Sequence, residues 1–263
     1  MCHPDIPEGQ ETPQVRQLEV EIPLSDGLTM PALLCRPDSD DGPRVVIIAD
    51  IFGRSPFYES LAARLADAGF LAVLPELFFR QGELENQTQE AAFERRNKLD
   101  DWQALADLQR TIDWLKAAGA SPRDNAGIMG FCMGGTFSLL LASERDDLAT
   151  VCYYGFPAQR RSDSGPPAPQ EVVDRMDGPI LGFWGAEDAA VGIDNVYAFA
   201  ASLESRGADF EYRVYPGLGH GFLAASRLDP DHTAYEAASD AWTRTLDFLR
   251  AQLLEEPPTA GHG

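Results

Sequence analysis

Basic residues are scarce in this chain of 263 residues, and lysine is nearly absent. Lysine and arginine together number 21 against 42 aspartates and glutamates, so the formal net charge is −21. Lys98 and Lys116 are the only lysines. Because nucleic-acid phosphates and anionic bilayers attract a basic protein surface, this balance argues against both as partners.

Long apolar runs and clustered cysteines are missing as well. No stretch reaches the roughly 18 apolar residues of a membrane span, and the polar, acidic start of the chain has no signal-peptide core. The four cysteines are widely scattered, which disfavours a disulfide scaffold. We therefore expect free thiols, no membrane partner and a cytoplasmic protein.

Apolar residues are nevertheless plentiful enough for a full core, at 44% of the chain. We expect one domain over residues 17–254, between flexible tails at 1–16 and 255–263. The Pro- and Ser-rich segment 160–171 interrupts this domain as an excursion loop. The sequence leaves the choice between monomer and dimer open.

Strand and helix patterns alternate along the domain. Runs rich in β-branched and aromatic residues predict eight strands, at 17–24, 28–35, 44–50, 70–77, 126–130, 149–155, 179–185 and 211–216. Apolar residues three or four positions apart predict helices at 56–68, 86–119, 136–144, 193–205 and 233–254. This alternation is typical of an α/β domain with a mainly parallel sheet and helices on both faces.

A glycine-rich turn carries the strongest chemical signal. The segment Gly130-Phe131-Cys132-Met133-Gly134-Gly135 lies between a short strand and an apolar helix, which is the pattern of a nucleophile elbow with cysteine in place of serine. The N-terminus of the helix favours negative charge and so supports a thiolate and an oxyanion. A buried structural cysteine beside a glycine-rich turn is the alternative.

Chain order supplies partners for this cysteine. Asp188 follows the strand at 179–185, and His220 follows the strand at 211–216 in a glycine-rich loop. An acid and then a histidine after the nucleophile is the order of a hydrolase triad. Glu187 and Asp194 are rival acids, and a loop histidine without a catalytic role is the alternative for His220.

Two backbone amides are candidates for an oxyanion hole. One is the N–H of Met133, directly after the nucleophile, and the other is the N–H of Ile51, in the loop after the strand at 44–50. No P-loop, dinucleotide-binding fingerprint, HExxH or CxxC pattern occurs in the sequence. We expect no cofactor and no metal.

Taken in order, these pieces resemble the dienelactone hydrolase family of the α/β-hydrolase superfamily. The matching segments are IFG after the third strand, LFFRQ, GFCMGG, the aspartate after FWG, and GHGF. The resemblance covers most of residues 17–250 and implies a single α/β-hydrolase domain without a large cap. It also implies a triad of Cys132, Asp188 and His220.

The resemblance assigns accessory roles, with two departures. The acid that precedes IFG in the family is a glutamate that interacts with the thiol, and here it is the shorter Asp50. Arg80 matches one arginine that holds the substrate carboxylate in the family. The second family arginine lies just after the histidine, whereas the first candidate here is Arg227.

These patterns predict a cysteine-dependent hydrolase whose partner is a small-molecule ester or lactone, similar to a carboxymethylenebutenolidase. A general carboxylesterase or a thioesterase on the same triad is the alternative. A non-catalytic ligand-binding domain of this fold and a redox-sensing thiol, with Cys152 as the second cysteine, are further alternatives.

Overall fold

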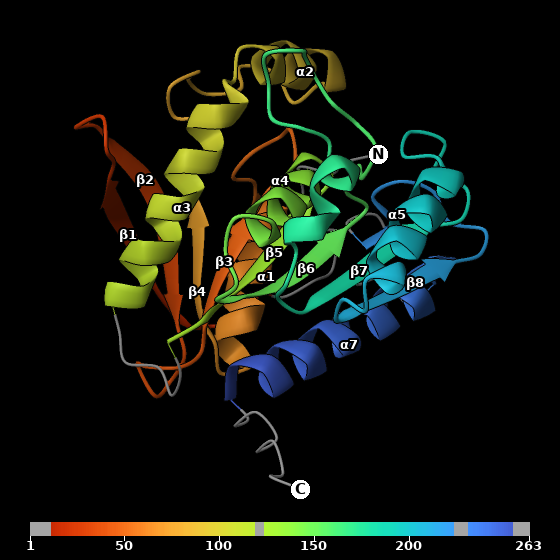
Figure 1. Cartoon of the computed structure of the whole chain (residues 1–263). Helices are drawn as coiled ribbons and strands as arrows, with labels where there is room; N and C mark the ends of the chain where they lie inside the picture. Colours follow the sequence, from red (N-terminus) through yellow and green to blue (C-terminus); the bar gives the residue numbers. More distant parts are fainter. Residues whose placement is uncertain (1–11, 119–123, 224–230, 255–263) are drawn as a thin grey trace, which may run out of the picture.

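One sheet organises the molecule, which the computed structural model describes at residues 12–118, 124–223 and 231–254. Its strands are β1 (Arg16–Pro23), β2 (Thr29–Arg36), β3 (Arg44–Ile48), β4 (Leu71–Pro75), β5 (Ala126–Phe131), β6 (Leu148–Tyr153), β7 (Ile180–Gly185) and β8 (Phe210–Tyr215). They are arranged in the order β1-β2-β4-β3-β5-β6-β7-β8 (Figure 1). β1 and β2 pair antiparallel, β2 pairs antiparallel with β4, and all later pairs are parallel.

The turn between β1 and β2 follows from its sequence. Gly27 adopts a φ of 84°, a conformation that glycine reaches without steric cost. The Asp26 carboxylate accepts a hydrogen bond of 3.1 Å from the N–H of Leu28. This Asx-type turn confirms the hairpin that Asp-Gly predicts between two apolar runs.

The parallel strands form the centre of the core. Every residue of β3, β4, β5, β6 and β7 is buried, because strands with helices on both faces expose neither side to water. Their near-continuous apolar sequences are therefore explained by the architecture.

Helices cover both faces of the sheet (Figure 1). They are α1 (Pro56–Asp67), α2 (Gln89–Asn97), α3 (Asp101–Ala117), α4 (Met133–Ala142), the 3₁₀ helix η1 (Pro169–Arg175), α5 (Ile193–Ser205) and α7 (Tyr235–Leu254). A Cβ on Gly127 would contact α7, whereas one on Gly130 would contact α4. Since side chains alternate along a strand, α7 and α4 lie on opposite faces.

Two segments differ from their predicted form. The single helical stretch at 86–119 is two helices, because Asp100 caps α3 by accepting hydrogen bonds from the N–H groups of Trp102 and Gln103. The excursion predicted at 160–171 ends in η1. In Figure 1, α2 and the chain leading to η1 lie together above the α4 end of the sheet.

The predicted fold class is confirmed: the chain forms one α/β domain, and the described residues contain no separate cap. Of the predicted tails, residues 1–11 and 255–263 lie outside the described residues, and β1 begins at Arg16. Within the described ranges, no helix combines the length and hydropathy of a bilayer span.

Candidate active site

Cys132 occupies a sharp turn between β5 and α4. Its φ of 55° and ψ of −114° are unusual for a residue with a side chain, and such strain is tolerated where the surrounding structure enforces it. The N–H of Cys132 donates to the Tyr153 carbonyl at 3.0 Å, and its carbonyl accepts from the N–H of Thr136 at 3.1 Å. The thiol is therefore presented at the N-terminus of α4, with 7% of the residue exposed.

Two glycines make this turn possible. A Cβ on Gly130 would lie 2.0 Å from the Gly134 carbonyl oxygen, and one on Gly134 would lie 2.1 Å from the Ile48 carbonyl oxygen. Both distances are far below any non-bonded contact, so α4 can approach β5 and β3 only where side chains are missing. The glycines around the cysteine are thus required by close backbone packing.

Asp188 and His220, which the sequence places after two later strands, lie within hydrogen-bonding distance of each other. His220 Nδ1 lies 2.7 Å from Asp188 Oδ2, and Asp188 Oδ1 accepts hydrogen bonds from the N–H groups of Ala190 and Val191 at 3.0 and 3.1 Å. The aspartate is fixed in a loop beyond β7 and is 3% exposed. Because Nδ1 faces this carboxylate, proton exchange with a substrate has to use Nε2.

Aromatic rings set the orientation of the imidazole. Tyr154 packs edge-on against His220 with 5.0 Å between ring centroids, and Phe156 lies 5.3 Å away. Tyr154 itself has a φ of 41° and donates its N–H to the Phe183 carbonyl at 2.7 Å. The contact of Tyr154 with His220 is an addition from the structure.

The loop after β3 carries Ile51 and is held from two sides. Asp50 Oδ1 accepts from the N–H of Phe52 at 2.8 Å, and Asp50 Oδ2 accepts from the Tyr58 hydroxyl at 2.7 Å. Arg95 donates through Nη2 to the Phe52 carbonyl at 2.8 Å. Asp50 is 1% exposed, so its carboxylate serves as an internal anchor for this loop.

One cavity of about 530 Å³ brings several predicted residues together. Its lining includes Cys132, Met133, Ile51 and His220, with Asp188 behind the histidine. Met133 is the first residue of α4, so its N–H is among those that a helix leaves without an internal acceptor. The volume lies in the range of small-molecule sites.

Half of the remaining lining residues are apolar, and these come mainly from three segments; the other half are polar or charged. α2 provides Phe93, α4 provides Phe137 and Leu140, and the excursion after β6 provides Phe156 and Pro167. The cavity therefore offers an organic acyl or leaving group an apolar surface beside polar side chains.

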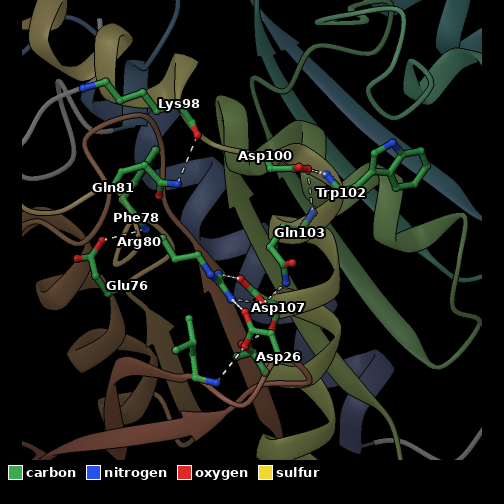
Figure 2. A network of polar contacts seen from close by, with 12 residues as sticks. Asp26, Glu76, Phe78, Arg80, Gln81, Lys98, Asp100, Trp102, Gln103 and Asp107 are labelled. Atoms are coloured by element: carbon green, nitrogen blue, oxygen red, sulfur yellow. Dashed lines mark hydrogen bonds and ion pairs between the residues drawn. The ribbon is translucent and has the colours of Figure 1, made fainter.

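Arg80 does not line this cavity. Its guanidinium pairs with Asp107, and its Nη2 lies 2.6 Å from Asp26 of the first turn (Figure 2). Asp107 also accepts from Gln103 at 3.0 Å. Two carboxylates thus neutralise the arginine that the resemblance assigns to substrate binding. Arg227, the other candidate, lies outside the described residues.

Two arginines that the sequence reasoning missed do line the cavity. Arg96 at the end of α2 and Arg161 in the excursion both pair with Asp101, at 2.7 and 2.9 Å. Their positions in the sequence gave no signal, because the two arginines are 65 residues apart and meet only in the folded chain. The lining contains charge of both signs, with the positive sign in excess.

The rival residues lie elsewhere. Glu187 and Asp194 are exposed and do not line the cavity. Cys152 is buried under α4, where its thiol contacts the Gly135 carbonyl at 3.5 Å, and burial raises its pKa to about 12. In the part of the chain that the structure describes, no group of three or more metal-ligating side chains is present.

The sheet order is that of an α/β-hydrolase, with the Cys132 turn after β5, Asp188 after β7 and His220 after β8. A model of the dienelactone hydrolase family matches residues 30–253. The chain belongs to the dienelactone hydrolase family. The predicted family and the predicted enzyme class, a hydrolase, are confirmed.

Individual relatives agree with this membership. The chain is 36% identical over 225 residues to a carboxymethylenebutenolidase of Rhodococcus opacus, covering 85% of this chain and 87% of the relative. It is 34% identical over 252 residues to a Yersinia pestis protein assigned the same activity, covering 94% and 92% of the two chains. A Klebsiella pneumoniae crystal structure assigned as a dienelactone hydrolase is similar, with a TM-score of 0.80, 34% identity, and coverage of 90% and 98%.

Proposed function

We propose that this protein hydrolyses activated esters or lactones through a triad of Cys132, Asp188 and His220. The observation that carries the proposal is the strained cysteine turn opening into the same cavity as His220, which is paired at 2.7 Å with a buried aspartate. The name of the Rhodococcus opacus relative, a carboxymethylenebutenolidase, supports an unsaturated lactone as the substrate class.

The first half of the reaction acylates the cysteine. His220 accepts the Cys132 proton at Nε2, while Asp188 holds Nδ1 and stabilises the imidazolium. The thiolate attacks the acyl carbon, and the carbonyl oxygen becomes an oxyanion bound by the N–H groups of Met133 and Ile51. Collapse of this intermediate breaks the bond to the leaving oxygen, which takes the proton from His220.

The second half releases the acid. His220 removes a proton from water, and the hydroxide attacks the thioester carbon. The same two amides bind the second oxyanion, and the Cys132 thiolate leaves and is reprotonated by His220. A lactone thereby becomes a ring-opened hydroxy acid, or its keto form when the leaving oxygen was an enol.

A thiolate nucleophile favours substrates with good leaving groups. A thiolate is itself a better leaving group than an alkoxide or an amine anion, so the tetrahedral intermediate of a poor substrate returns to reactants. Enol lactones, aryl esters and thioesters expel their leaving group readily. A thioesterase remains the alternative on the same residues, and a substrate panel distinguishes it by preference for thioesters over matched oxygen esters.

Substitution of the nucleophile tests the proposal. We expect Cys132→Ala to abolish turnover of 4-nitrophenyl acetate and to prevent formation of an acyl-enzyme detected by intact mass. The matched control is Cys35→Ala, which removes a thiol buried in β2 and should keep most of the activity. Undiminished turnover by purified Cys132→Ala would show that another group performs the chemistry, and a folded wild type that is never acylated would favour a binding role.

A further inference from the structure

The cavity contains a cluster of charged side chains at its α2 end. Arg96, Asp101 and Arg161 line the cavity together; Cys132 and His220 aside, no other titratable side chain among the described residues does so. Two arginines and one aspartate leave a net charge of +1 inside a chain whose formal charge is −21. An anion entering this cavity would therefore meet a local field opposite in sign to that of the surface.

The two arginines are engaged to different extents. Arg161 uses all three of its nitrogens: Nε donates to Asp101 at 2.9 Å, Nη2 to the Leu99 carbonyl at 2.5 Å, and Nη1 to the Arg96 carbonyl at 3.4 Å. These bonds tie the excursion after β6 to the α2–α3 junction. Arg161 is thus occupied as a structural connection.

Among the described residues, Arg96 donates a side-chain hydrogen bond through one nitrogen. Its Nη1 donates to Asp101 Oδ1 at 2.7 Å, and the Phe137 ring lies 5.6 Å from its guanidinium carbon. Within the described ranges of the chain, Nε and Nη2 bind no acceptor, and neither atom is fully buried. The side chain as a whole is only 11% exposed, so these two donors are presented to the cavity.

A guanidinium that is as buried as that of Arg96 is energetically unfavourable without a counter-ion. Burial is also the main cause that lowers the pKa of Arg96, opposed by the hydrogen bond and charge of Asp101 and by the negative charge of a Cys132 thiolate. Arginine remains protonated in proteins regardless. Asp101 already shares its charge with Arg161, so a second anion at Arg96 would be favourable.

We propose that Arg96 is the anion-binding, specificity-determining residue of this site, and that it accepts the carboxylate of an acidic ester or lactone through Nε and Nη2. This inference rests on the proposed function. It differs from the expectation for Arg80, whose guanidinium is already neutralised by Asp26 and Asp107. The apolar lining then surrounds the unsaturated part of the substrate next to the bound carboxylate.

Two pairs of probes that differ only by a carboxylate test the inference. Iodoacetate and iodoacetamide alkylate Cys132 without requiring hydrolysis, and 4-acetoxybenzoate and 4-acetoxybenzamide report on turnover. In Arg96→Gln we expect the acid-to-amide rate ratio to fall about 10- to 100-fold in both pairs, which corresponds to the loss of a hydrogen bond to a charged group. The ratio is the readout because the Arg96 charge also acts on a Cys132 thiolate and so affects both probes of a pair alike. Arg96→Lys should restore part of the ratio because it restores the charge.

Controls separate this role from a structural one. Arg110→Gln removes an equal charge from an exposed position on α3 and should leave both ratios unchanged. Asp101 keeps Arg161 as a partner in Arg96→Gln, and thermal unfolding checks that the variant folds. Unchanged ratios in folded Arg96→Gln, or a loss in Arg80→Gln instead, would overturn the proposal. Activity that survives in Cys132→Ala would instead refute the proposed function.

Discussion

The carboxylate of Asp50 offers a sharp test of how the oxyanion loop is held. In the structure Asp50 Oδ1 accepts a hydrogen bond from the N–H of Phe52 at 2.8 Å, and Oδ2 accepts one from the Tyr58 hydroxyl at 2.7 Å. Asp50→Asn preserves both contacts, because the amide oxygen can accept from Phe52 and the amide nitrogen can donate to the Tyr58 oxygen. The variant therefore removes the charge and keeps the anchor.

The magnitude follows from these two bonds. Hydrogen bonds to charged groups exceed neutral ones by about 1 kcal/mol each, so the loss of charge at these two bonds should lower the free energy of unfolding by about 2 kcal/mol. Asp50→Ala removes the carboxylate that accepts from Phe52 and Tyr58, at about 1–3 kcal/mol for each hydrogen bond. It also frees the loop that carries Ile51, and the loss of one oxyanion donor lowers kcat about 10²- to 10³-fold.

Thermal unfolding and steady-state kinetics on the same preparations measure both effects. We expect Asp50→Asn to retain kcat/KM within about tenfold, and Asp50→Ala to lose far more, with a clear fall in Tm. If instead the Asp50 charge acts on the thiol, as the resemblance to family members with glutamate implies, Asp50→Asn should lose about 10²- to 10⁴-fold in kcat/KM. That loss at an almost unchanged Tm would refute the anchor role.

Two further predictions concern the triad and the buried thiols. Asp188→Asn should lower kcat about 10²- to 10⁴-fold with little change in circular dichroism, because the amide favours the wrong tautomer of His220; wild-type rates in this variant would contradict the triad. Burial raises the pKa of Cys35 and of Cys152 to about 12, so both remain thiols at pH 8. Iodoacetamide at pH 8 should therefore modify Cys132 and spare these two, and peptide mass mapping measures this. Equal labelling of Cys35, Cys132 and Cys152 would show that Cys35 and Cys152 are not protected by burial.

The fold was predictable because its strands and turns carry local signals. Continuous apolar runs in the sequence predict the buried parallel strands, and the Asp26-Gly27 pair predicts the turn of the hairpin. The tight turn at Cys132 was equally predictable, since Gly130 and Gly134 are required by backbone contacts that no side chain can replace. The break between α2 and α3 was missed because Asp100, a common capping residue, lies within a continuous helical periodicity.

The charge distribution of the site could not be predicted from the sequence. Arg80 matches a substrate-binding position, yet its environment depends on Asp107 and on Asp26, which are 27 and 54 positions away. Motif matching reports which side chain is present and says nothing of which carboxylates surround it. The same limitation concealed Arg96, which lies in a polar helix with no motif of its own.

Electrostatics explains why the acidic composition is compatible with an anionic substrate. At a Debye length of about 10 Å in 0.1 M salt, most surface carboxylates are screened from the interior of the cavity. The Arg96 and Asp101 side chains are only 11% and 8% exposed, so they interact in a lower effective dielectric than surface charges do. The local balance at the α2–α3 junction, and not the total of −21, therefore determines which substrates bind. Because Asp101 must neutralise one of two arginines for the junction to be stable, the remaining charge is a single one, which suits one carboxylate.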